Sequence, residues 1–332
     1  MTEPIRWGIL GAANFAKNQM APAINAAKDA VLYGLATTSP AKAASFQAIA
    51  PGLHVYDSYD ALLADAAIDA VYVPLPNHLH ITWSLKALAA GKPVLTEKPI
   101  AMNASDIAPL IAARDSAGLL AAEAYMIVHH PQWQRARALY REGAIGTLQQ
   151  IDGFFSYDNS ADPSNIRNTP ETGGGSLPDI GVYTIGSARF VTGAEPSDVT
   201  ADIVWDNGVD ATAHVTADLA GARFQATTSM RMHPRQEMTF HGSDGILRLT
   251  APFNANVFAD AELELHRNAP AGGAPSVTVE RWTGVNQYVL QVEAFGRSIR
   301  DGADYPWSLE AAQCTQAVID AALANAKGGT TP

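Results

Sequence analysis

Short apolar runs alternate with helix-like stretches over the first 120 residues of the chain. The apolar runs lie at residues 5–10, 31–37, 70–75, 93–96 and 119–123. Alanine-rich stretches of helical character lie between them, at residues 40–50, 58–67 and 81–91. Strands that alternate with helices predict a parallel sheet with helices on both faces. Ligands of such sheets bind beyond the carboxyl ends of the strands.

The second half of the chain shows a different pattern. Apolar and polar residues alternate there as in half-buried strands, at residues 148–157, 198–205, 210–219 and 222–232. A helix is predicted from Ser308 to Ala326. Because 332 residues are too many for one ordinary core, we expect an α/β protein of two domains.

Composition narrows the class of protein. Lys and Arg number 22 against 33 Asp and Glu, a formal net charge of −11, which disfavours nucleic acid as a partner. The single cysteine, Cys314, lies in a helical pattern and is expected to be a buried, inert thiol in a reducing compartment. The chain carries no recognisable targeting segment and no apolar run of about 18 residues. We therefore expect a soluble, cytoplasmic protein that makes no contact with a membrane.

A glycine motif follows the first predicted strand, in GILGAANFA at residues 8–16. A dinucleotide fingerprint needs glycine at the tight turn, and small residues beside the pyrophosphate and where helix meets strand. Gly11, Ala13 and Ala16 occupy these places. A plain strand–turn–helix is the alternative, but the position after the first strand favours the nucleotide. The residues predicted to contact a cofactor here are Gly8, Gly11, Ala12, Ala13, Asn14 and Phe15.

The end of the second predicted strand bears on the choice between NAD and NADP. An enzyme that uses NAD usually has Asp or Glu there, to bind the ribose 2′-hydroxyl. This chain has Thr37, Thr38, Ser39 and, one turn later, Lys42. Hydroxyl groups, a helix N-terminus and a lysine suit a 2′-phosphate, so NADP is the preferred cofactor and NAD stays possible. The same hydroxyls are also good N-caps, and both roles can hold together.

Two more motifs end predicted strands. In VPLPNHLH, residues 73–80, two prolines stiffen the strand end and Asn77 is a good N-cap. In TEKP, residues 96–99, Lys98 is a candidate for substrate binding and acid–base support if a nicotinamide lies there, and a surface charge otherwise. The residues of these motifs predicted to contact the cofactor are Leu75, Pro76, Asn77, His80, Glu97 and Lys98.

Four histidines raise the question of a metal site: His78, His80, His129 and His130. Histidines two residues apart are poor ligands on a helix, and no spacing of carboxylates or cysteines supports them. We expect no bound metal.

Five motifs follow one another along the chain: GxxGxA, PNHLH, AGKPVLTEKP, EAYMIVHHPQW and GGGSLPDIGVY. In this order, and with NQYVLQVEAFGRSIRDG near the C-terminus, they resemble the Gfo/Idh/MocA family of oxidoreductases over the whole chain. The resemblance implies a Rossmann dinucleotide-binding domain at residues 1–122. It also implies a substrate-binding and oligomerisation domain at residues 123–332, with a large, open, mostly antiparallel sheet. One face of that sheet commonly forms the dimer interface in the family.

The family's catalytic pattern falls on Lys98, Asp179 and Tyr183. Tyrosine at the last position, with Arg167 in NIRNTPETGGG, is similar to one branch of the family. That branch contains glucose–fructose oxidoreductase, D-xylose dehydrogenase and dimeric dihydrodiol dehydrogenase. The resemblance implies that substrate is bound by Lys98, Arg167, Asp179 and Tyr183.

Two positions depart from that branch. Val128 stands where members often have arginine, so a contact to cofactor or substrate is missing or supplied differently. Thr38 replaces an arginine often found on the second strand, which weakens the preference for NADP.

The glycine-rich motif raises its own question, because glycine is costly to order and this chain has three in a row. We expect them to let the backbone turn tightly beside the nicotinamide, with Pro178 in the first turn of a helix. Asp179 and Tyr183, four residues apart, then share one helix face. Tyrosine has a reference pKa of about 10, and a nearby ammonium group favours its phenolate form. Tyr183 is thus the predicted general acid or base, and Asp179 holds substrate hydroxyls or orients the tyrosine; a capped helix with a buried tyrosine is the alternative.

The function predicted from the sequence is hydride transfer between nicotinamide and a sugar or related polyhydroxylated compound. An aldose 1-dehydrogenase is the leading instance; a ketosugar reductase of the anhydrofructose type and a dihydrodiol dehydrogenase are alternatives. A catalytically silent, nucleotide-sensing regulator is the alternative from another class, and the joint presence of Lys98, Asp179 and Tyr183 argues against it. The expected assembly is a homodimer or a dimer of dimers, through an apolar face of the second sheet that no helix covers.

Overall fold

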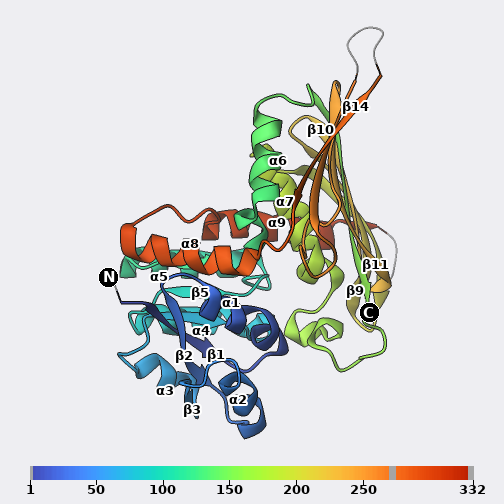
Figure 1. Ribbon diagram of the computed structural model, residues 1–332. Coiled ribbons are helices and arrows are strands. Elements are labelled where there is room, and N and C mark those ends of the chain that lie inside the picture. The colour runs from blue at the N-terminus through green and yellow to red at the C-terminus, as the bar shows by residue number, and fades with distance from the viewer. Residues whose placement is uncertain (1–2, 269–273, 328–332) are drawn as a thin grey trace. The chain divides into compact units, whose positions relative to one another are not determined.

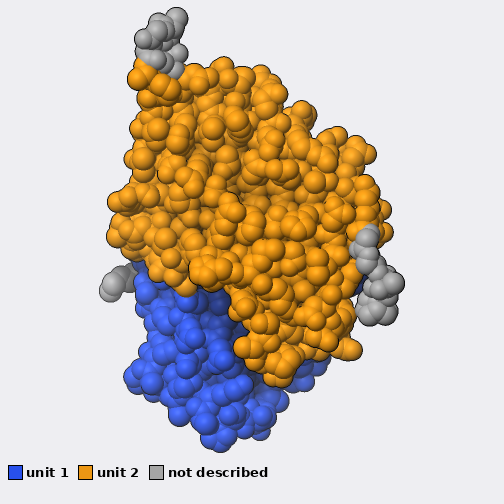
Figure 2. Space-filling view, turned by 90° about the vertical axis from the view of Figure 1, so that its right-hand side faces the viewer, with its two compact units in different colours: residues 1–129, 286–313 blue, residues 130–285, 314–332 orange. Residues whose placement is uncertain are grey.

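A computed structural model of the protein shows two compact units, each with a sheet of its own (Figure 1). The structure describes residues 3–268 and 274–327. Unit 1 comprises residues 1–129 and 286–313, and unit 2 comprises residues 130–285 and 314–332 (Figure 2). The sequence suggested one boundary after residue 122. The structure differs by placing it after His129 and by returning residues 286–313 to unit 1.

Unit 1 is built on a six-stranded parallel sheet with strand order β3-β2-β1-β4-β5-β6. This confirms the predicted doubly wound fold. One strand, β3, has no counterpart in the sequence prediction, because its three residues are largely exposed and form no apolar run. The strands are β1 (Ile5–Leu10), β2 (Ala30–Ala36), β3 (His54–Tyr56), β4 (Ala70–Val73), β5 (Val94–Thr96) and β6 (Ala121–Glu123).

The helices of unit 1 follow the predicted alternation. They are η1 (Ala16–Met20), α1 (Ala21–Ala26), α2 (Pro40–Gln47), α3 (Tyr59–Ala64), η2 (Asn77–Leu79), α4 (His80–Ala89), η3 (Ala104–Asp106), α5 (Ile107–Ala117), η4 (Met126–His129) and α8 (Gln287–Asp301). Helix α9 (Leu309–Ala324) begins in unit 1 and ends in unit 2.

Aromatic packing explains why α8 belongs to unit 1 although it is far away in sequence. The ring of Phe295 lies 5.1 Å from that of Trp7 on β1, and both side chains are fully buried. The ring of Tyr288 meets Phe15 edge-on at 5.7 Å. Burying such rings is among the largest favourable contributions in a core, so α8 completes the core of the nucleotide-binding unit.

Unit 2 contains a nine-stranded sheet of order β14-β13-β12-β11-β7-β10-β9-β8-β15. Among the described strands of this sheet, the parallel pairs are β7–β10 and β8–β15, which confirms the predicted mostly antiparallel sheet. The predicted strand at residues 222–232 is divided at the buried Met230. The strands are β7 (Leu148–Asp158), β8 (Ser197–Asp206), β9 (Val209–Leu219), β10 (Ala222–Ser229), β11 (Arg231–Gly242), β12 (Gly245–Leu249), β13 (Ala261–Arg267), β14 (Ser276–Trp282) and β15 (Ala326–Lys327).

The described helices of unit 2 lie on one face of this sheet (Figure 1). They are α6 (Pro131–Arg141), η5 (Ile166–Asn168), η6 (Pro170–Thr172), η7 (Leu177–Gly181) and α7 (Val182–Thr192), with the end of α9. Strand β9 shows how the two faces differ, because Ala213, Val215 and Ala217 are buried while His214 and Asp218 are exposed. The apolar side of the alternation therefore packs against the helices.

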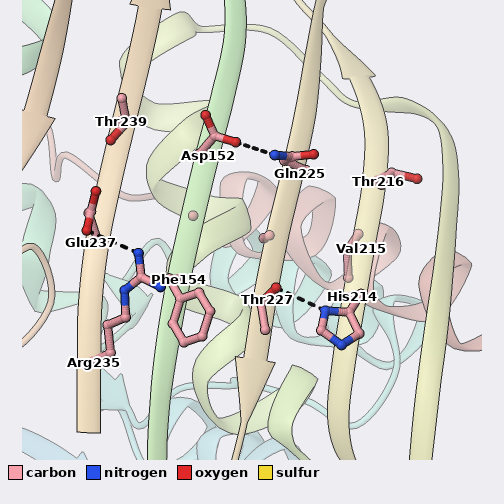
Figure 3. A pocket seen from close by; sticks show the side chains of 12 residues that line it. Asp152, Phe154, His214, Val215, Thr216, Gln225, Thr227, Arg235, Glu237 and Thr239 are labelled. Atoms are coloured by element: carbon pink, nitrogen blue, oxygen red, sulfur yellow. Dashed lines mark hydrogen bonds and ion pairs between the residues drawn. The ribbon is translucent and has the colours of Figure 1, made fainter.

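The opposite face of the sheet, which we call the outer face, is mainly polar. The sequence analysis expected this face to be apolar, and that expectation is wrong because the apolar positions of the strands point toward the helices. A shallow hollow of about 500 Å³ lies on it across β7, β9, β10 and β11 (Figure 3). Its lining includes Asp152, Phe154, His214, Gln225, Arg235 and Glu237.

Among residues 3–268 and 274–327, no helix is long and apolar enough to cross a lipid bilayer.

Candidate active site

The residues predicted to act on cofactor and substrate fall into two groups, one in each unit. Lys98 and all of the predicted cofactor contacts belong to unit 1, and Arg167, Asp179 and Tyr183 belong to unit 2.

The turn after β1 has the geometry that a phosphate-binding loop needs. Gly11 has φ +91°, a backbone conformation that residues other than glycine rarely adopt. A Cβ atom at Gly11 would lie only 2.8 Å from the side chain of Leu75. Ala12 and Ala13 are half-buried, and the backbone enters a helix at Asn14. A close backbone approach beside a helix N-terminus fits the pyrophosphate of a dinucleotide.

The end of β2 presents hydroxyl groups and a lysine beside the N-terminus of α2. The Thr37 hydroxyl accepts from the backbone N–H of Ser39 at 3.2 Å, and the Ser39 hydroxyl caps α2 by accepting from the N–H of Lys42 at 3.4 Å. Thr38 and Lys42 are exposed. Both readings of these residues are therefore compatible, with Thr37 and Ser39 shaping the backbone and Thr38 and Lys42 facing solvent.

The predicted cofactor contacts in the loop after β4 differ in how deeply they are buried. Pro76 and Asn77 are half-buried, whereas Leu75 is 8% exposed and His80 is fully buried. Both ring nitrogens of His80 lie beside backbone carbonyl oxygens, Nδ1 at 2.8 Å from Pro99 and Nε2 at 2.6 Å from Leu75. The sequence prediction made His80 a cofactor contact, but the structure engages its ring with the protein backbone.

Two acidic residues hold the backbone around Lys98, the half-buried Glu97 and the buried Glu123. Glu97 accepts from the Tyr72 hydroxyl at 2.5 Å and from the N–H of Lys98 at 3.2 Å. Glu123, at the end of β6, accepts from the N–H of Ile100 at 2.9 Å and from the indole N–H of Trp307 at 2.9 Å. Burial raises the pKa of Glu123 to about 7, and these two hydrogen bonds oppose the shift.

In unit 2, the three consecutive glycines permit close backbone contacts that any side chain would obstruct. A Cβ at Gly174 would lie 2.5 Å from the carbonyl oxygen of Arg167. A Cβ at Gly175, which has φ +130°, would lie 1.9 Å from Oδ1 of Asp210. The sequence analysis explained these glycines by a nicotinamide, but protein contacts within unit 2 already require two of them.

Asp210 caps the helical segment that carries the predicted catalytic residues. Its Oδ2 accepts from the N–H of Leu177 at 2.6 Å and from the Ser176 hydroxyl at 3.0 Å, at the start of η7. Asp210 is 2% exposed, and burial raises its pKa to about 7 while those donors oppose the shift. Sequence analysis missed this role, because Asp210 lies on a strand 33 residues beyond Leu177.

Asp179 lies in η7 and its carboxylate is held by two side chains. Arg167 Nε is 2.9 Å from Oδ1, and the Tyr157 hydroxyl donates to Oδ2 at 2.5 Å. The negative charge of Asp179 raises the pKa of Arg167, and burial together with that charge raises the pKa of Tyr157. Arg167 therefore stays cationic and Tyr157 stays a neutral donor, an arrangement that favours an ionised Asp179.

Tyr157 is a residue that the sequence analysis missed. It lies near the end of β7, where alternation of buried and half-exposed residues makes a tyrosine look like an ordinary strand residue. Its position immediately before the loop that carries Arg167 was the available clue, because binding residues often lie where strands end.

Tyr183 lies in the first turn of α7, one turn after Asp179, and is 5% exposed. Its ring packs against Phe155 at 5.8 Å and Phe253 at 5.6 Å. These aromatic contacts fix the direction of the ring. The spacing of four residues therefore places the two predicted catalytic side chains on one side of a continuous helical segment, η7 and α7.

The remaining candidate residues are buried or contact other residues of the protein. Val128 is fully buried in η4, and the ring of His129 contacts the Tyr305 hydroxyl at 3.2 Å. His130 caps α6 by accepting from the N–H of Gln132 at 3.1 Å. Within the described part of the chain, no group of three or more His, Cys, Asp or Glu residues is arranged to hold a metal ion.

Comparison with known proteins identifies the family. Residues 5–125 match the oxidoreductase family with the NAD-binding Rossmann fold, and residues 133–248 match the Gfo/Idh/MocA C-terminal domain. The chain belongs to the Gfo/Idh/MocA family of oxidoreductases. As a member of this family it is an NAD(P)-dependent oxidoreductase, and the family predicted from the order of the motifs is confirmed.

Three relatives illustrate the range of this similarity. A D-xylose 1-dehydrogenase (NADP⁺) of Haloferax volcanii is 31% identical, over 97% of this chain and 98% of the relative. A dTDP-3,4-didehydro-2,6-dideoxy-α-D-glucose 3-reductase of Actinomadura kijaniata is 33% identical, over 90% of this chain and 86% of the relative. The solved structure of a 3-ketoreductase of Actinomadura kijaniata, in complex with NADP and TDP-benzene, has a TM-score of 0.87 at 28% identity and covers 98% of both chains.

The contact between Gly175 and Asp210 leads to a stability prediction. We expect Gly175→Ala to lower the free energy of unfolding by about 3 kcal/mol or more, because it adds a clash to an unfavourable φ. Gly193→Ala is the matched control, since Gly193 has φ +70° but nothing within 4 Å of its Cβ position. Its cost should be about 1 kcal/mol. Denaturant unfolding of both variants measures the difference.

The same measurement in an Asp210→Ala background tests the cause. Gly175→Ala should cost less there, because the obstructing carboxylate is gone, with a coupling of about 1 kcal/mol or more. Equal losses for the two glycines, or strictly additive effects with Asp210→Ala, would show that the close contact is not what requires Gly175.

Proposed function

We propose that this oxidoreductase prefers NADP and acts on a sugar or a related polyhydroxylated compound, with aldose 1-dehydrogenase as the leading activity. The observation that carries the proposal is the carboxyl group of Asp179, held by Arg167 and Tyr157 one helical turn before Tyr183. A fixed carboxylate beside a phenol can hold a substrate hydroxyl while the phenol moves its proton. The similarity to an NADP⁺-dependent D-xylose 1-dehydrogenase supports the substrate class.

The residues of unit 1 fit a nicotinamide dinucleotide. Gly11 turns the backbone directly before a helix N-terminus, which suits a pyrophosphate, and Thr38 with Lys42 suits a ribose 2′-phosphate. When bound, the nicotinamide supplies the hydride acceptor or donor. Lys98 contributes a positive charge on a backbone that Glu97 and Glu123 hold in place.

The chemistry of the chain's own residues follows from these positions. In the oxidation of an aldose, the C1–H bond breaks and its electron pair leaves with the hydride. The C1 hydroxyl gives its proton to the phenolate form of Tyr183, which becomes a neutral phenol, and a lactone forms. We infer that Asp179 holds a neighbouring hydroxyl and that Lys98 favours the charged form of the reacting oxygen. In the reverse direction Tyr183 returns the proton to the carbonyl oxygen.

A ketoreductase of a sugar nucleotide is the second candidate. It is favoured by the likeness to the 3-ketoreductase of Actinomadura kijaniata, which covers 98% of both chains. The same residues would serve it in the reductive direction. The two candidates separate in a substrate panel, because an aldose dehydrogenase reduces NADP⁺ with free aldoses and a ketoreductase consumes NADPH with a keto-sugar nucleotide.

We also propose that two copies of the chain pair through the outer face of the sheet in unit 2. The described helices leave this face open, and its hollow carries groups that can form hydrogen bonds with a second copy. Phe154, stacked under Arg235 at 4.2 Å, and Val204, which is 60% exposed, add apolar surface.

The role of Tyr183 is tested by its conversion to phenylalanine. Tyr183→Phe should keep the fold and cofactor binding, because the ring contacts with Phe155 and Phe253 remain. Turnover should fall by about 10²–10⁴-fold, the usual contribution of a positioned general acid or base. Tyr140→Phe, in the same unit, is the control and should keep wild-type turnover. Near-equal turnover of Tyr183→Phe and wild type at saturating substrate would mean that another group moves the proton.

The cofactor preference is tested at Thr38. Wild type should bind NADP(H) more tightly than NAD(H), since the exposed end of β2 offers hydroxyls and Lys42 to a 2′-phosphate. Thr38→Asp should weaken NADP(H) binding about tenfold or more, a difference of about 1.4 kcal/mol. Thr38→Asn adds no charge and should leave the preference intact. Calorimetry gives each dissociation constant; a wild type that favours NAD(H) several-fold contradicts the assignment.

The pairing of two copies is tested by light scattering. Wild type at micromolar concentration should scatter as a dimer or larger, and Thr227→Arg, in the hollow of the outer face, should shift it toward the monomer of 35.1 kDa. Ser116→Arg, on an exposed turn of α5, should not. A wild-type monomer would contradict the proposal, and so would a Thr227→Arg variant that stays fully dimeric.

A further inference from the structure

Two buried side chains contact the peptide group between Pro99 and Ile100, which lies just beyond Lys98. The carbonyl oxygen of Pro99 lies 2.8 Å from Nδ1 of His80, and the N–H of Ile100 donates to Oε1 of Glu123 at 2.9 Å. This carbonyl and this N–H are the two ends of one peptide group. His80 is fully buried and Glu123 is 2% exposed, so water competes little for either contact.

His80 also connects this peptide to the loop after β4. Its second ring nitrogen, Nε2, lies 2.6 Å from the carbonyl oxygen of Leu75. Burial lowers the pKa of His80, to about 4, and the contacts with the two carbonyls oppose the shift. A neutral ring carries one N–H, so it donates to one of these two carbonyl oxygens at a time and packs against the other. One side chain thus ties the ends of β4 and β5 together, whereas Glu123 ties the end of β6 to the same peptide.

We propose that His80 and Glu123 are positioning residues for Lys98, acting as a clamp on the Pro99–Ile100 peptide. Lys98 has a long, flexible side chain, so its ammonium group can be placed only as well as its backbone is held. Glu97 holds the N–H of Lys98 on one side, and the clamp holds the peptide beyond Pro99 on the other. The inference rests on the role proposed for Lys98 in hydride transfer.

A double-mutant comparison tests whether His80 acts through Lys98. His80→Ala should lower turnover by about 10²-fold with the aldose that the panel identifies, as expected when a catalytic group is misplaced by about 1 Å. In a Lys98→Met background, the same change should cost less than threefold, because the group that it positions is already gone. Ser84→Ala, which removes a buried hydroxyl bonded to the His80 carbonyl but not to the clamp, is the control and should keep turnover.

Glu123 allows a second test, in which the ring of His80 is left in place. In Glu123→Gln the amide oxygen can accept from Ile100 or from Trp307, but its NH₂ group then faces the other N–H. Turnover should fall about tenfold or more, as when a buried donor is left without an acceptor. Trp307→Phe removes the competing donor, so the variant Glu123→Gln/Trp307→Phe should regain turnover to within threefold of Trp307→Phe alone. A purely electrostatic role of Glu123 would give no such recovery.

Amide hydrogen exchange tests the clamp without cofactor or substrate. The N–H of Ile100 should be protected in wild type, exchange at least tenfold faster in Glu123→Gln, and regain protection in Glu123→Gln/Trp307→Phe. Exchange at Ile100 that is the same in all three proteins would overturn the clamp. Losses of turnover that multiply between His80→Ala and Lys98→Met would overturn its action on Lys98. If Lys98→Met kept full turnover, the role proposed for Lys98 would be wrong. The exchange rate of the Ile100 N–H would still show whether His80 and Glu123 hold the peptide.

Discussion

The buried carboxylate of Asp210 is the constraint on which the catalytic half of unit 2 depends. It accepts from the N–H of Leu177 and the hydroxyl of Ser176 and so fixes where the helical segment begins. A helix start leaves N–H groups without partners, and a buried start needs an acceptor from elsewhere in the fold. Because Asp210 lies on β9, the sheet determines the position of Asp179 and Tyr183. The glycine at residue 175 is the counterpart of this arrangement, since only a residue without Cβ leaves space for the carboxylate.

In unit 1, too, side chains form hydrogen bonds with backbone that lies outside regular secondary structure. The loops after β4 and β5 must be irregular to form a binding edge, and irregular backbone loses the hydrogen bonds that a sheet supplies. Glu97, Glu123 and His80 take over these bonds with side chains that are mostly buried. The polar groups of His80 and Glu123 are desolvated by the fold, so their contacts are strong while they are made and costly when they are broken. The loops are thereby rigid without regular secondary structure.

Local patterns in the sequence predicted much of this architecture. Apolar runs placed β1, β2, β4, β5 and β6, and the order of the motifs predicted the family and both sheets. The i, i+4 spacing correctly put Asp179 and Tyr183 one turn apart in a helical segment. Such features are visible because residues close in sequence determine them.

The features that the sequence did not reveal depend on contacts between distant residues. Tyr157 and Asp210 look like ordinary strand residues, and only the paired sheet brings them to η7. The attachment of α8 to unit 1 depends on Phe295 meeting Trp7, almost 290 residues away in the chain. His80 was assigned to the cofactor because it lies in the right loop, yet the direction of its ring is set by two carbonyls. The outer face was expected to be apolar because periodicity shows that a strand has two faces without showing which one the helices cover.

Transfer of a hydride from a sugar carbon to a nicotinamide cofactor is the reaction that we propose for this chain. It is tested most directly with aldoses that carry deuterium at C1, incubated with the wild-type protein and NADP⁺, followed by mass spectrometry of the reduced cofactor. The account predicts that the cofactor gains one deuterium and that the sugar is recovered as its lactone. An aldose oxidised without transfer of deuterium to the cofactor, or a full panel of aldoses and keto-sugar nucleotides that gives no change in either nicotinamide, would contradict it.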